Sequence, residues 1–233
     1  MKKFYREVGV REDEGSFSVC LDGRPVKTPA KNSLAVPNNA LADAIAEEWR
    51  TDADEIDPAA MPLTRLANSA IDRVSTHRGA VIDDIAGFAA TDLVCYRSSE
   101  PPELRDRQDE DWGEILAWLK RSREIDLKST ESVLPLDQDR KDLETVRHVV
   151  ASFDDFSLAG LHMVTSACGS VALGLATADG EINGDRAWEL SLLEEPYQIN
   201  EWGEDPEATK RRANLRADIG AAARFLSLLR EQG

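Results

Sequence analysis

The chain has 233 residues, of which 42% are hydrophobic and 31% charged, a composition typical of a folded globular protein and not of a disordered one. Its formal net charge of −16 argues against binding to nucleic acid or to anionic membrane surfaces, which requires basic patches. No run approaches the ~20 apolar residues of a membrane helix, so we expect no membrane insertion. The three cysteines lie far apart, and no apolar segment follows the charged start. These features indicate a reducing compartment, either the bacterial cytoplasm or, for a processed organellar form, the mitochondrial matrix.

Residues 1–37 are expected to form a small antiparallel sheet. Their apolar residues alternate in part and are rich in Val, Phe and Tyr, which favours strands. Asp22-Gly23 is typical of a tight hairpin turn, because glycine accepts the backbone conformation that such turns need. The expected strands lie within 3–10, 16–22, 24–29 and 32–36. A sheet this small needs support from another part of the chain.

From residue 38 onward the apolar spacing becomes that of helices, and Asn38-Asn39 supplies an N-cap. A single helix over 157–178 is apolar nearly all round, so we expect it at the centre of the core. The other expected helices cover 41–49, 63–74, 81–89, 103–124, 139–153 and a last segment after Asp205-Pro206. The predicted class is therefore α+β, with a small β-rich N-terminal domain (1–37) and a larger all-helical C-terminal domain (38–233).

The stretch from Trp188 to Glu207 combines an apolar stripe with dense acidic charge. A single helix face is predicted from the spacing of Trp188, Leu192, Glu195, Ile199 and Trp202. Glu195 stands in the middle of that face, and the helix breaker Pro196 follows it. Such local conflicts are expected at functional sites. Alternatively, the helix ends near Glu194 and restarts at Pro196, which leaves Glu195 as a solvated junction.

The charge around Glu195 sets a condition on its burial. Residues 179–207 contain ten acids and one arginine. A buried and unpaired carboxylate is very costly, so a buried Glu195 needs a cation. Arg186 and the basic run 210–212 are the nearest cations in sequence.

No catalytic or cofactor motif is apparent. The sequence contains no P-loop or dinucleotide fingerprint, and its three histidines have no metal-binding spacing. Glu194 and Glu195 are adjacent, so on a helix they face different directions, which argues against a carboxylate pair. We therefore expect no enzyme activity and no cofactor, although a carboxylate-based hydrolase stays an alternative.

Three stretches together resemble the family of assembly chaperones that handle the α subunit of F-type ATP synthase. The first is LDGRPVKTPAKNSLAVP (21–37), and the third is EEPYQINEWGEDPEA (194–208). The second begins EEWRTDADEIDPAAMPLTRLANSAID (47–72) and continues to TDLVCYR (91–97). The chain departs from the family pattern at Trp112-Gly113, where an Asp-Pro is expected after the tryptophan, and it matches the pattern loosely over 125–138.

The resemblance implies a function and a fold. Family members bind the unassembled α subunit, shield the surface that later meets the β subunit, use no nucleotide and are displaced during assembly. The implied fold is a β-rich domain followed by a helical one. The resemblance also implies a functional acidic residue in the C-terminal region. Glu195 is the best match for it, and Glu194 and Glu201 are the next candidates.

The client-binding surface predicted on this basis combines apolar anchors with acids. The anchors are Trp188, Tyr197, Ile199 and Trp202, since Trp and Tyr are common at interfaces. The surrounding acids would steer a basic client. An alternative interpretation has equal weight: the tryptophans belong to the hydrophobic core, and the acids form a solvated rim. We expect a monomer when free, and we keep a structural adaptor retained in the finished complex as an alternative.

Overall fold

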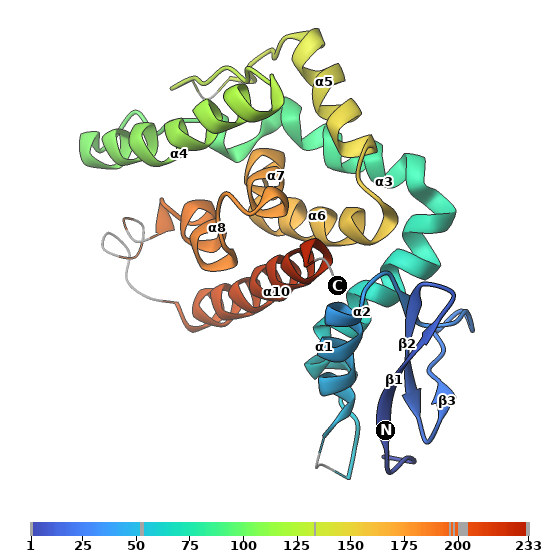
Figure 1. Ribbon diagram of the computed structural model, residues 1–233. Helices are drawn as coiled ribbons and strands as arrows, with labels where there is room; N and C mark the ends of the chain where they lie inside the picture. Colours follow the sequence, from blue (N-terminus) through green and yellow to red (C-terminus); the bar gives the residue numbers. More distant parts are fainter. Residues whose placement is uncertain are drawn as a thin grey trace.

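The computed structural model describes residues 2–51, 54–132, 134–195, 197, 199 and 205–231. Its N-terminal part is an antiparallel sheet of β1 (Val8–Asp13), β2 (Ser16–Leu21), β3 (Arg24–Pro25) and β4 (Ala35–Val36) (Figure 1). β2 is the central strand, and β1, β3 and β4 all pair with it. The carboxylate of Asp22, in the turn after β2, accepts hydrogen bonds from the backbone N–H groups of Arg6 and Glu7 at 3.0 and 2.9 Å. The predicted sheet is confirmed.

Helices make up most of the remaining chain, which confirms the α+β class (Figure 1). They are α1 (Asn39–Trp49), α2 (Pro62–Ser69), α3 (Ser75–Gly87), α4 (Pro102–Arg123), α5 (Arg140–Ala151), α6 (Asp155–Cys168), α7 (Val171–Asp179), α8 (Gly184–Ser191) and α10 (Pro206–Arg230). Short 3₁₀ turns lie at Pro58–Ala60, Phe88–Thr91 and Leu93–Cys95, and a π-helical turn lies at Ala70–Val74. In the described part of the chain, no helix is long and apolar enough to cross a lipid bilayer.

The sheet leans on α1, which packs against β1 and β2. Asn38 caps α1 as predicted, because its side-chain oxygen accepts from the N–H of Leu41 at 2.9 Å. Its amide nitrogen also donates to the carbonyl of Leu228 at 2.8 Å, near the end of α10. The start of the first helix is thus tied to the end of the last. The domain boundary between residues 37 and 38 stays a prediction.

Two carboxylates from the second family-like stretch brace the N-terminal half. Glu48 accepts hydrogen bonds from the N–H groups of Leu63 and Thr64 at 2.7 and 2.8 Å, so it caps the start of α2. Asp72 accepts from the hydroxyl of Thr28 at 2.7 Å and from the side chain of Asn32 at 2.9 Å. The specific sequence of this stretch therefore has a structural cause, since these carboxylates join the sheet loop, α1 and the α2–α3 segment.

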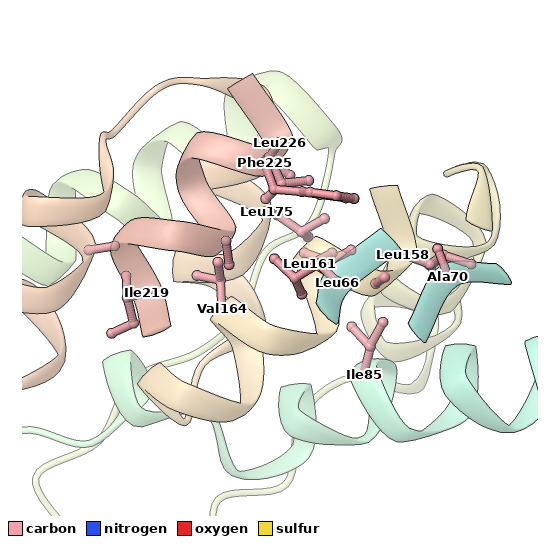
Figure 2. Close-up of a cluster of buried hydrophobic side chains, with 14 of the residues drawn as sticks. Leu66, Ala70, Ile85, Leu158, Leu161, Val164, Leu175, Ile219, Phe225 and Leu226 are labelled. Carbon is pink, nitrogen blue, oxygen red and sulfur yellow. The ribbon is translucent and has the colours of Figure 1, made fainter. Parts of the chain in front are cut away.

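The core is centred on α6, against which α2, α3, α7 and α10 pack. Figure 2 shows Leu158, Leu161 and Val164 of α6 facing side chains from those helices, among them Phe225 of α10. All four are fully buried. Burial of each such side chain contributes about 1.5–3 kcal/mol. The expectation of a central apolar helix is therefore confirmed for α6.

The prediction of one continuous helix over 157–178 is wrong, because the chain breaks at residues 169–170. Gly169 has φ +66 and ends α6, and the side chain of Ser170 caps α7 by accepting from the N–H of Leu173 at 3.0 Å. A left-handed glycine and a serine cap are the ordinary signals of a helix end and a helix start. In an apolar run, the sequence alone does not distinguish these two signals from small residues within one helix.

The two halves of that run fold back on each other, and Gly174 of α7 packs directly against α6. A Cβ atom at Gly174 would lie 2.2 Å from Oγ1 of Thr165 and 3.1 Å from Cδ1 of Leu161. We expect Gly174→Ala to lower the free energy of unfolding by about 1–3 kcal/mol, because the added methyl group overpacks the interface. Chemical denaturation measures this change. The matched control is Gly113→Ala in α4, where nothing lies within 4 Å; it should stabilise the protein by about 0.5–1 kcal/mol.

Asp92 joins the turn after α3 to the start of α7. It is 1% exposed, and its carboxylate accepts from the N–H groups of Val94 and Ala172, each at 3.1 Å. Burial raises the pKa of Asp92 to about 6, against hydrogen bonds from Ser170 and from backbone N–H groups that lower it. This aspartate belongs to the TDLVCYR block, which therefore also has a structural role.

Candidate functional site

The segment after α8 does not form the single helix face that the spacing predicted. α8 ends at Ser191, Leu192 leaves the helical region with φ −125 and ψ 22, and a turn follows before the backbone is helical again at Glu195. Trp188 and Glu195 therefore belong to different segments, so that part of the predicted stripe is wrong. Trp202 and Glu201, the other predicted site residues of this stretch, lie outside the described residues.

Helix α4 holds this segment through three polar contacts. The indole nitrogen of Trp112, which is 1% exposed, donates to the carbonyl of Leu190 at 2.9 Å. Asp111 forms an ion pair with Arg186 of α8. Gln108 donates from Nε2 to Oε1 of Glu194 at 2.9 Å. The end of α8 and the turn that follows are thus fixed from a helix about 80 residues earlier in the chain.

Glu195 turns the other way, toward α10. Its carboxylate lies 3.3 Å from Nη1 of Arg212 and 3.5 Å from Nη2 of Arg211. The side chain of Glu195 is 18% exposed and that of Arg212 is 15% exposed, so the pair is largely shielded from water. The alternative is therefore wrong in leaving Glu195 solvated, although the helix is interrupted before Glu195 as it expected. Of the two suggested cation sources, the basic run supplies the partners. Arg186 pairs instead with Asp111 and Glu189.

A groove of about 440 Å³ lies between α4, α8 and α10. Its walls are mostly apolar, and charged side chains stand at its rim. It is lined by Arg107, Trp188, Glu189, Leu192, Leu193, Glu195, Ile199 and Arg212. The Trp188 ring is half-buried, and the guanidinium of Arg216 lies 5.0 Å from its centroid. An apolar cavity with a mixed charged rim suits an apolar side chain of a protein partner.

The structure thus brings together some of the predicted site residues and separates others. Trp188, Glu195 and Ile199 share the groove. Glu194 points to α4, so the two adjacent carboxylates diverge as expected. Tyr197 is half-buried and does not line the groove.

Gln108 is one residue of this site that the sequence analysis missed, and Arg107, Glu189 and Leu193 of the groove lining are others. Gln108 is fully buried, as are Leu104 four residues before it and Trp112 four residues after it. A polar residue on an apolar stripe was the available signal, and the same signal was recognised at Glu195. The sequence analysis predicted this helix over 103–124 without assigning a role to Gln108.

Outside the groove, we considered whether the described cysteine thiols are reactive and whether any described side chains are arranged to bind a metal ion. Burial raises the pKa of the Cys95 and Cys168 thiols to about 12, so these thiols are protonated and poorly nucleophilic at neutral pH. Within the ranges that the structure describes, no cluster of three or more His, Cys, Asp or Glu residues is arranged to hold a metal ion.

A family model described as ATP12 chaperone protein matches residues 2–120, which is about half of the chain. The chain belongs to the ATP12 chaperone family. This is a family of chaperones for assembly of the F1 part of ATP synthase. Among curated proteins, the chain is 25% identical over 214 residues to the mitochondrial protein atp12 of Schizosaccharomyces pombe, covering 87% of this chain and 74% of that protein.

Solved structures of ATP12 proteins share the fold. Atp12 of Paracoccus denitrificans is 40% identical, with a TM-score of 0.94 and 98% coverage of both chains. An aspartate-to-lysine mutant of the same protein gives the same values. A chain from Agrobacterium tumefaciens is 38% identical with a TM-score of 0.91, covering 98% of this chain and 86% of that one. The architecture of this ATP12 protein is therefore that of its solved relatives.

The ion pairs between Glu195 and α10 are expected to stabilise the groove, and reversing the charge of Glu195 tests this. Glu195→Lys would place a third cation beside Arg211 and Arg212, so the contact would become repulsive. We expect a lower melting temperature and a loss of order in the groove, measured by calorimetry and by Trp188 fluorescence. Adding Arg212→Glu restores opposite charges and should recover much of both signals. If the double variant were as impaired as Glu195→Lys alone, the ion pair would not be what holds this contact.

Proposed function

We propose that this ATP12 protein binds the free α subunit of F-type ATP synthase, shields its subunit interface from aggregation and is released when the β subunit arrives. The observation that carries the proposal is the apolar groove with its charged rim, at the C-terminal stretch whose sequence resembles the family. An unassembled subunit exposes an apolar interface, which is an aggregation hazard. A chaperone needs an apolar surface to cover that interface and charge to keep the complex soluble.

The groove supplies both requirements. Leu192, Leu193 and Ile199 offer aliphatic contact, and Trp188 offers a large anchor of the kind that dominates interface energies. The indole N–H of Trp188 is buried, and it finds no acceptor within the described residues. A buried donor without an acceptor is rare in native proteins.

The net negative charge of the whole protein favours reversible binding of a basic client. The net charge of −16 lets the chaperone steer a basic client surface at a distance and keeps the complex soluble. We propose that the free chaperone is a monomer, that it is not an enzyme and that its cycle uses no nucleotide. We place it where F1 is assembled, in the bacterial cytoplasm or the mitochondrial matrix.

Light scattering of aggregating α subunit tests the proposal. We expect a stoichiometric amount of the chaperone to suppress the signal without nucleotide. Subsequent addition of β subunit should release the chaperone from its complex with α, as size-exclusion chromatography would show. Retention in the finished ATP synthase would instead indicate a structural adaptor. Failure to suppress aggregation at any ratio would reject the α subunit as the client.

A further inference from the structure

Gln108 is a polar residue at a fully buried position on an apolar helix face, which is unusual. It is fully buried on α4, between Leu104 and Trp112, which are also buried. A buried amide that lacks partners is costly, so an apolar residue would serve packing better at this position. The partners of Gln108 are therefore informative.

Both ends of the amide are engaged. Its oxygen accepts from the backbone N–H of Ser98 at 2.6 Å, and its nitrogen donates to Oε1 of Glu194 at 2.9 Å. The backbone N–H of Ser98 can only donate, so the amide oxygen must face it. The NH₂ group must then face Glu194, whose ionised carboxylate can only accept. The orientation of the amide is thus fixed by the chemistry of both neighbours.

The backbone at Ser98, which donates to the Gln108 amide, is held in place by contacts with α4. The preceding residue, Arg97, is 7% exposed, and its Nε donates to Asp109 of α4 at 2.9 Å. Its guanidinium also lies 5.3 Å from the centroid of the Trp112 ring. Helix α4 carries Gln108 and also holds the chain at Ser98. The hydrogen bond from the Gln108 amide therefore fixes the position of the Glu194 carboxylate relative to α4.

This arrangement holds Glu194 without neutralising it. Glu195 lies beside two arginines, whereas the hydrogen bond to Glu194 comes from a neutral amide. Among the residues that the structure describes, no cation forms an ion pair with Glu194. Its side chain is also partly exposed, next in the chain to two groove-lining residues. A fixed, charged and accessible carboxylate suits recognition of a cation.

We propose that Gln108 is a positioning residue that presents the carboxylate of Glu194 to a cationic side chain, Arg or Lys, of the client. This inference rests on the proposed function, because it takes the client to be the protein bound at the groove. It also assigns different roles to the two adjacent acids. Glu194 contacts the client, and Glu195 fixes the groove wall to α10.

Affinity for purified α subunit at low and high salt tests the assignment. Wild-type affinity should fall as ionic strength rises. Glu194→Gln should weaken binding about ten-fold at low salt and reduce the salt dependence, because one of the carboxylates that attract the client is gone. Gln108→Glu should weaken binding to a similar extent: it still accepts from Ser98, but its like charge repels Glu194 and displaces that carboxylate. Gln138→Glu, the same substitution in a loop distant in sequence and outside the groove lining, is the matched control and should bind like wild type.

A double variant separates positioning from simple bracing. Gln108→Glu with Glu194→Gln keeps the hydrogen bond from Ser98, remakes the bond between residues 108 and 194 with donor and acceptor exchanged, and moves the charge to the buried position. We expect its melting temperature to exceed that of Gln108→Leu, while its affinity and salt dependence stay like those of Glu194→Gln. Recovery of wild-type affinity by the double variant would overturn the proposal, since bracing alone would then be sufficient.

Two further outcomes distinguish this inference from the proposed function. If Gln108→Glu and Gln108→Leu bound like wild type while Glu194→Gln did not, the positioning role would be overturned and the groove proposal would stand. If wild type itself did not bind the α subunit, the proposed function would fail first.

Discussion

Asp92→Ala should lower the free energy of unfolding by about 3 kcal/mol at neutral pH. The substitution leaves the N–H groups of Val94 and Ala172 without their acceptor in a buried setting. Each unsatisfied buried group costs about 1–3 kcal/mol. It also removes an anion from the start of α7, where the helix dipole favours one. Denaturant unfolding followed by circular dichroism measures the loss.

The pH dependence of the Asp92 contribution has a definite sign. The pKa in the folded protein is raised to about 6, above the ordinary value of 3.8, so the folded state favours the protonated acid. Relative to Asp92→Asn, the wild type should therefore lose stability as the pH rises from about 4 to 6. Asp126→Ala, at an exposed aspartate, is the control and should have an effect within about 0.5 kcal/mol. A wild-type curve parallel to that of Asp92→Asn would contradict the raised pKa.

Leu192→Asp should weaken binding of the client roughly a hundred-fold, which corresponds to about 2.7 kcal/mol. The substitution puts a carboxylate into the apolar part of the groove, where it would have to be desolvated on binding. Leu192 is half-buried, so we expect the fold to survive. The measurement is the affinity for α subunit together with the melting temperature of the free chaperone.

The chain offers a matched control for this substitution. Leu134 is 69% exposed, in the loop before α5 and not among the groove-lining residues. Leu134→Asp adds the same charge to the protein, so it separates a local effect in the groove from a general effect of net charge. It should bind like wild type. Equal weakening by both variants would show that the groove is not the site.

Much of the fold could be predicted because its signals are local. The apolar stripe of α4 and the proline entry to α10 lie within short segments, and both helices were found near their predicted positions. The break between α6 and α7 could not be found in this way. Gly169-Ser170 lies in an apolar run, and only the folding back of α7 onto α6 shows that these residues end one helix and start another.

The site could be predicted only where its contacts are short in sequence. The basic run 16–17 residues after Glu195 was one of the two cation sources suggested for it, and that pairing is present. The partner of Glu194 is Gln108, 86 residues earlier. The direction of each carboxylate is set by such long-range packing. Sequence spacing therefore could not give these directions, and the family resemblance ranked Glu195 above Glu194 for the client-binding role.

Hydrogen–deuterium exchange on the complex with the α subunit tests the central claim, that the groove binds the client, most directly. We expect slower exchange in the described segments that form the groove, the end of α8 with the turn to Glu195 and the first turns of α10. Exchange in the sheet β1–β4 should stay unchanged. Protection of the sheet, with exchange around the groove as fast as in the free protein, would contradict the account.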